Sequence, residues 1–151
     1  MNQSIRRTDP QGLLFLAAGL SLAAAVIHGI VTPEHFEEWW GYGTFFLVTT
    51  IAQALYGLML LPQGRGYMRL LGLRADRARD LGRFYWLGII GNAAIILLWA
   101  ITRTLGVPLF GPDAGEVEEV TLISLASVIL EVVLIGCLFL LMQRAQREAV
   151  S

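Results

Sequence analysis

The sequence predicts an all-α membrane protein in which four transmembrane helices form an antiparallel bundle, accompanied by short interfacial helices. The chain has 151 residues and is 56% hydrophobic, and its apolar residues are concentrated in four stretches. Each stretch is about as long as the ~20 residues that an α-helix needs to cross the hydrocarbon core of a bilayer. The stretches cover residues 12–32, 43–62, 84–106 and 119–142. They and their connections occupy almost the whole chain, so residues 1–151 are predicted to form one transmembrane domain.

The charged residues indicate how these helices are oriented. Arginines precede the first stretch, separate the second from the third and follow the fourth, whereas Arg103 alone lies on the other side. The acidic residues of the two opposite connections are Glu34, Glu37, Glu38, Asp113, Glu116, Glu118 and Glu119. The positive-inside rule therefore predicts that both termini are cytoplasmic. Since this topology explains the arginines, they give no reason to expect nucleic-acid binding, and the lipid bilayer is the predicted partner.

The first connection is predicted to contain a short interfacial helix. Thr32 is a favoured N-cap residue, and Pro33 suits the first position of a helix. The first long helix is therefore expected to end near Val31, and a short helix to cover residues 33–40. The aromatic residues of 39–46 are typical of the belt found at a membrane–water boundary.

The other two connections differ in composition. Residues 67–83 combine many arginines with scattered leucines, a pattern that predicts an amphipathic helix on the membrane surface. The third connection holds several glycines and prolines, which disfavour regular structure. Glu116, Glu118 and Glu119 are expected at the start of the fourth helix, where acidic side chains favour the positive end of the helix dipole.

Glu131 is the most unusual residue, because a charged side chain is costly at the centre of a bilayer. It lies about 12 residues into the fourth stretch, or ~18 Å deep at ~1.5 Å per residue. The same count places Gln53 and Asn92 in one central layer with Glu131, and His28 nearer the surface, about one turn below the end of its helix. Ser127 shares a helix face with Glu131. These polar stripes predict a polar interior in the outer half of the bundle, closed below by apolar residues.

These residues allow more than one interpretation. Gln53, Asn92 and a protonated Glu131 can form a hydrogen-bond network that only holds the helices together. In another interpretation, Glu131 faces a cavity that accepts a ligand, an ion or a proton. In a third, a membrane partner subunit or a second copy of the chain supplies the counter-charge. The candidate ligand-binding residues are His28, Gln53, Asn92, Arg103, Ser127 and Glu131.

The two histidines raise the question of a metal site. His28 and His35 lie close in sequence, with Glu34 and Glu38 beside the second. Imidazole and carboxylate groups together suit a divalent transition metal, so these four residues are the candidate metal ligands. Their spacing matches no established zinc or di-iron motif. In the alternative, His28 hydrogen-bonds within the bundle and His35 is an interfacial residue.

Arg103 is expected to bind an anion or to pair with an acidic residue of the outer connections. The second interpretation is favoured, because such a pair would tie the connections together over the polar interior. The candidate partners are Glu34, Glu37, Glu38, Glu116 and Glu119.

Two sequence segments carry a resemblance to a known type of protein. The segment PEHFEEWWGYGTFF, and RTLGVP followed two residues later by GP, resemble those of a type of uncharacterised small bacterial four-helix integral membrane protein. The resemblance covers both outer connections and the adjoining helix ends. It implies the four-span layout and a multi-pass location in the bacterial plasma (inner) membrane, and it implies no activity.

The sequence favours a membrane protein whose polar outer half binds a small ligand or a metal ion. One alternative is an accessory or anchoring subunit of a membrane complex. Another is a small proton-linked transporter that uses Glu131, although no inverted repeat of the kind common in transporters is visible. An enzyme is not predicted, because neither a nucleophile–base pair nor a cofactor motif is recognisable.

Overall fold

A computed structural model describes residues 10–61, 69, 72, 78–108 and 111–148 of the chain. This part is built from four α-helices: α1 (Pro10–Glu38), α2 (Trp40–Leu60), α4 (Ala78–Thr102) and α5 (Leu122–Glu148). All four are long and apolar enough to cross a membrane. The prediction of an all-helical protein with four such segments is therefore confirmed.

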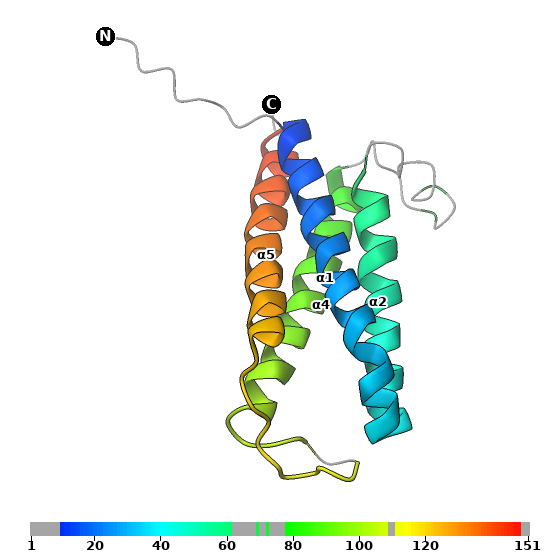
Figure 1. Ribbon diagram of the computed structural model, residues 1–151. Helices are drawn as coiled ribbons and strands as arrows, with labels where there is room; N and C mark the ends of the chain where they lie inside the picture. The colour runs from blue at the N-terminus through cyan, green and yellow to red at the C-terminus, as the bar shows by residue number, and fades with distance from the viewer. Residues whose placement is uncertain (1–9, 62–68, 70–71, 73–77, 109–110, 149–151) are drawn as a thin grey trace.

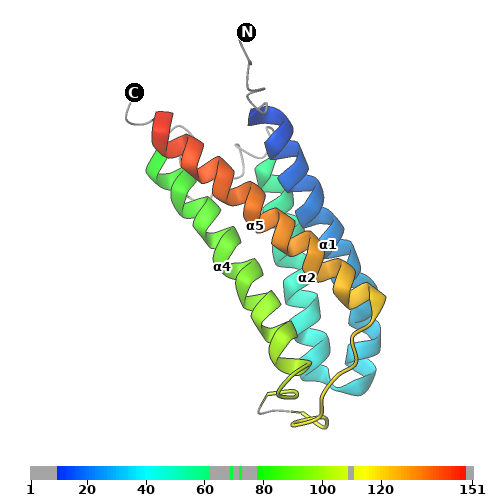
Figure 2. The ribbon, with the colours of Figure 1, turned by 90° about the vertical axis from the view of Figure 1, so that its left-hand side faces the viewer.

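Successive helices run in opposite directions, so the bundle has two distinct ends (Figure 1). We call the end where α1 begins and α5 finishes the terminal end. The opposite end, which carries residues 103–108 and 111–121, is called the loop end. Helix α1 packs against α2 and α5, and α4 packs against α5. Figure 2 shows α5 crossing from α1 toward α4 on its way from the loop end to the terminal end. The bundle thus consists of two helical hairpins, α1–α2 and α4–α5, joined chiefly through α1 and α5.

The predicted break after Val31 is wrong, because α1 continues through Pro33 to Glu38. Proline has no backbone N–H, so the carbonyl of Gly29 loses the partner that a regular helix would give it here. The Thr32 hydroxyl donates to the carbonyl oxygen of His28 at 2.7 Å, one turn earlier. The helix is interrupted only at Trp39, which has an extended backbone (φ −166°, ψ 138°). No separate interfacial helix therefore exists between α1 and α2.

The other predicted boundaries are partly corrected. Most of residues 67–83 lies outside the described residues, but from Ala78 onward the chain already belongs to α4. The acidic residues 116–119 precede α5, because the helix begins at Leu122. Thr121 and Ser124 cap that helix reciprocally: each side-chain oxygen accepts the other residue's backbone N–H at 3.2 Å. This exchange satisfies two of the free N–H groups at the start of α5.

The described part of the connection between α4 and α5 contains no helix, but backbone hydrogen bonds hold it together. Val107 and Ala114 form an isolated bridge, and the Val107 N–H donates to the carbonyl of Glu116 at 2.8 Å. Gly106 has φ +96°, and a Cβ there would collide with the backbone of Gly115. A glycine is therefore required at this close approach of two backbone segments.

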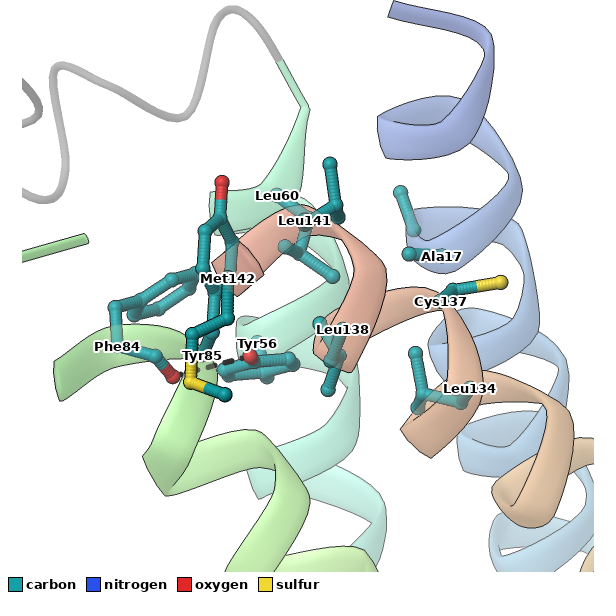
Figure 3. Close-up of a cluster of buried hydrophobic side chains, with 11 residues drawn as sticks. Ala17, Tyr56, Leu60, Phe84, Tyr85, Leu134, Cys137, Leu138, Leu141 and Met142 are labelled. Atoms are coloured by element: carbon teal, nitrogen blue, oxygen red, sulfur yellow. Dashed lines mark hydrogen bonds between the residues drawn. The ribbon is translucent and has the colours of Figure 1, made fainter. Parts of the chain in front are cut away.

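The terminal half of the bundle is closed by an apolar core (Figure 3). Leu134 and Leu138 of α5 are completely buried. The ring of Tyr56 on α2 stacks on that of Phe84 on α4, with 4.6 Å between centroids, and its hydroxyl donates to the Phe84 carbonyl at 3.1 Å. Tyr56 thereby satisfies its polar atom inside an otherwise apolar layer.

Candidate functional site

Glu131 lies at the middle of α5 with no exposed surface, although it carries an ionisable group. Its Oε1 atom is 3.0 Å from Nε2 of His28 on α1. The same oxygen accepts a hydrogen bond from Nε2 of Gln53 on α2, at 3.1 Å. One carboxylate oxygen therefore connects α5 to both helices of the first hairpin.

Two further side chains complete this cluster. Nε2 of Gln53 also donates to Oδ1 of Asn92 on α4 at 3.2 Å, and Nδ2 of Asn92 donates to the Gly88 carbonyl at 2.8 Å. Oγ of Ser127, one turn before Glu131, lies 3.3 Å from Nε2 of His28. We call the five side chains the polar centre: His28, Gln53, Asn92, Ser127 and Glu131, each at most 5% exposed.

The sequence places these residues together for simple geometric reasons. Residues four apart on a helix share a face, so Ser127 and Glu131 both point toward α1. On α2, Thr49, Gln53 and Tyr56 recur at helical spacing on one face, and all three are buried. The Ser21 hydroxyl of α1 donates to the backbone carbonyl of Gln53 at 2.7 Å, which fixes the neighbouring turn of α2 against α1.

His28 is deeper than the sequence predicted. The prediction placed it one turn from the end of its helix because α1 was expected to end near Val31. Since α1 continues to Glu38, His28 lies ten residues from that end, or about 15 Å at ~1.5 Å per residue. It therefore lies level with Glu131 and contacts it directly.

The hydrogen bonding of the polar centre is incomplete. Among the described residues, Oε2 of Glu131 and Oε1 of Gln53 are buried without any partner. Both are acceptor atoms, because a carboxylate and an amide oxygen accept hydrogen bonds. No donor of the five side chains is left unpaired in the same way. The centre is therefore short of donors, and buried unpaired acceptors of this kind call for an explanation.

The four predicted metal ligands do not converge. His28 turns inward to Glu131, whereas Nδ1 of His35 is bonded to the carbonyl of Val31 at 2.8 Å and the His35 ring lies 3.9 Å from that of Phe46. Glu34 and Glu38 are exposed. In the described residues, no group of three or more His, Cys, Asp or Glu side chains could hold a metal ion. The described structure does not bring these four side chains together, and a metal site built from them stays a prediction.

Arg103 lies apart from the polar centre, at the end of α4. Its NH1 atom is 2.7 Å from Glu118, which was not among the predicted partners, and 2.6 Å from the Thr102 hydroxyl. Its guanidinium carbon lies 5.3 Å from the centroid of the Trp99 ring. Glu118 is brought to Arg103 by its backbone N–H, which donates to the Thr102 carbonyl at 3.0 Å. No spacing in the sequence indicates this pairing, because it depends on the path of the connection.

Comparison of the chain with protein-family models, with curated proteins and with solved structures finds no match. The geometry of the polar centre is therefore the basis for a functional proposal.

Proposed function

We propose that the protein is a small proton-linked carrier of the bacterial inner membrane, with the His28–Glu131 pair as its proton-binding group. In this proposal both termini are cytoplasmic and the loop end faces outward. The arginines at the beginning of α4 and at the end of α5 support that orientation, since those two helix ends belong to the terminal end. The observation that carries the proposal is the 3.0 Å contact between His28 and Glu131 at complete burial of the carboxylate.

The charge of the pair explains why a proton is the species involved. An ionised Glu131 beside a neutral His28 leaves a net negative charge in the membrane interior, which is costly. One shared proton makes the pair neutral, either as an ion pair or as two uncharged groups hydrogen-bonded to each other. The preferred occupant of the pair is therefore one proton, and its gain or loss changes the free energy of the buried centre strongly.

The two halves of the bundle differ in what they bury. Toward the terminal end the buried side chains are mostly apolar, including Leu134, Leu138 and Leu141, and the hydroxyl groups of Ser21 and Tyr56 there are bonded to backbone carbonyls. From the polar centre toward the loop end, buried side chains include the hydroxyls of Thr32, Thr49 and Thr102. Protons move readily only where polar groups or water can relay them. This difference favours exchange of the proton with the outer side in the arrangement described.

Proton flux into lipid vesicles tests the proposal. Purified protein is reconstituted into vesicles that contain a pH-sensitive dye, and a potassium diffusion potential, negative inside, drives protons inward. We expect wild-type vesicles to acidify faster than protein-free vesicles. Glu131→Gln should reduce the protein-dependent rate at least about tenfold, because an amide cannot take up the proton.

Tyr56→Phe is the matched control, because it also removes one buried interhelical hydrogen bond but lies outside the polar centre. It should keep the wild-type rate. A wild-type rate equal to that of protein-free vesicles, or a Glu131→Gln rate equal to wild type, would overturn the proposal.

A further inference from the structure

We propose that the polar centre binds a small protonated amine, which replaces the proton of the His28–Glu131 pair. This inference rests on the proposed function and names a class of solute for the same site. Its starting point is the pair of unpartnered buried acceptors, Oε2 of Glu131 and Oε1 of Gln53. They belong to side chains that are hydrogen-bonded to each other at 3.1 Å, so they lie on adjoining groups.

Counting donors and acceptors defines the missing partner. An ionised carboxylate offers about four lone-pair positions, and an amide oxygen offers two. The donors from His28 and Gln53 both go to Oε1 of Glu131, so its Oε2 and the Gln53 oxygen receive none. A ligand that pairs with these two oxygens therefore has to bring hydrogen-bond donors. It also carries positive charge, because the site has a carboxylate to neutralise when the proton leaves.

An N–H cation fits this description better than a metal ion. Magnesium demands six ligands and calcium six to eight, mostly oxygens, whereas the described centre has two spare oxygen atoms. A protonated primary amine carries three N–H donors and can bond both oxygens at once. The site lies between closely packed helices, so the amine is small, with a short apolar substituent.

The exchange balances without any other reactant. The amine enters as a cation, the pair releases its proton to water on the loop side, and the net charge of the centre is unchanged. No covalent bond other than the one that holds this proton breaks, and nothing is oxidised or reduced. Proton and amine thus compete for one carboxylate, and without amine the carrier still moves protons alone along a membrane potential.

Proton release on addition of methylammonium chloride tests the inference. The full-length protein, in weakly buffered mild detergent, is titrated with the salt while a pH indicator dye reports the released protons. We expect about one proton per chain from the wild type and none from Glu131→Gln, which lacks the carboxylate. Tyr56→Phe should release as many protons as the wild type. Sodium chloride is the matched control, because sodium supplies positive charge without N–H donors. The same proton release should need at least about tenfold more sodium than methylammonium.

The outcomes separate this inference from the proposed carrier function. Equal potency of sodium and methylammonium in the wild type would overturn it, because charge alone would then suffice. Release that persists in Glu131→Gln would also overturn it, by placing the amine elsewhere. If vesicles show Glu131-dependent proton flux but methylammonium releases no proton, the amine site is wrong and the carrier function stands. If the flux is absent as well, both fail.

Discussion

The position of Glu131 shows how one acid can be kept inside an apolar bundle. Its Oε1 atom contacts Nε2 of His28 on α1 and accepts a hydrogen bond from Gln53 on α2. Gln53 extends the network to Asn92 on α4. All four helices therefore contribute to the surroundings of one carboxylate. A buried charge is tolerated only when several groups hydrogen-bond to it, because the free-energy cost of its desolvation exceeds the gain from any single contact.

Substitution of Glu131 by leucine should destabilise the protein, because His28 and Gln53 would each lose one buried hydrogen-bond acceptor. The expected loss is about 1–3 kcal/mol of unfolding free energy for unsatisfied groups of this kind. Glu131→Gln should lose less, since its amide oxygen can still accept. Unfolding of the purified variants by a denaturing detergent measures the difference. A Glu131→Leu protein at least as stable as Glu131→Gln would contradict a structural role for these contacts.

Between the two hairpins, α2 and α4 meet through their side chains rather than by close packing of their backbones. Helices α2 and α4 are bridged by the Gln53–Asn92 hydrogen bond and by the stacking of Tyr56 on Phe84. The second contact needs a glycine at position 88, because a Cβ there would collide with the Tyr56 hydroxyl group and with Leu138. Small residues allow close helix approach inside a membrane, and here the small residue admits a side chain from the facing helix.

Gly88→Ala should therefore destabilise the bundle by about 1–3 kcal/mol, the usual cost of overpacking. Gly91→Ala is the matched control on the same helix, because its added Cβ would meet no atom within 4 Å. It should stay within about 0.5 kcal/mol of wild type, as substitutions at open positions do. The same detergent titration compares the two variants. Equal stability of both would show that Tyr56 can move aside at no cost.

At the scale of the whole molecule, the asymmetry of the buried side chains matters most. The apolar core occupies the terminal half, and the polar centre with the buried threonines occupies the middle and the loop half. The connection at the loop end is held to the end of α4 through Arg103 and Glu118. A partly exposed ion pair of this kind contributes little to stability, about 0–1 kcal/mol, so it can open without unfolding the bundle.

The proposed orientation predicts which end reagents outside the cell can reach. Cys137 is the only cysteine and is buried, so Cys137→Ala provides a cysteine-free background. In that background, a cysteine introduced by Glu37→Cys at the loop end should react with a membrane-impermeant maleimide in intact cells. Gln146→Cys at the terminal end should react only after the membrane is opened. The reverse pattern would invert the orientation.

The four apolar helices and the connections between them could be predicted from the sequence, because each depends on the composition of one segment. Whether a stretch such as 119–142 suits the bilayer is decided by its own apolar residues, and the layer of Gln53, Asn92 and Glu131 follows from counting turns. The start of α5 was harder to predict. The acidic residues Glu116, Glu118 and Glu119 suggested that the helix begins with them, but it begins at Leu122, where Thr121 and Ser124 form the cap.

The partners of the polar side chains depended on contacts between distant segments. Composition and charge along the chain are enough to give four apolar helices and the residues that face inward, since both act on one segment at a time. The continuation of α1 past Pro33, the contact of His28 with Glu131 and the pairing of Arg103 with Glu118 could not be read in that way. Each brings together atoms whose distance is set only when the helices pack, because packing fixes the depth and direction of every side chain at once.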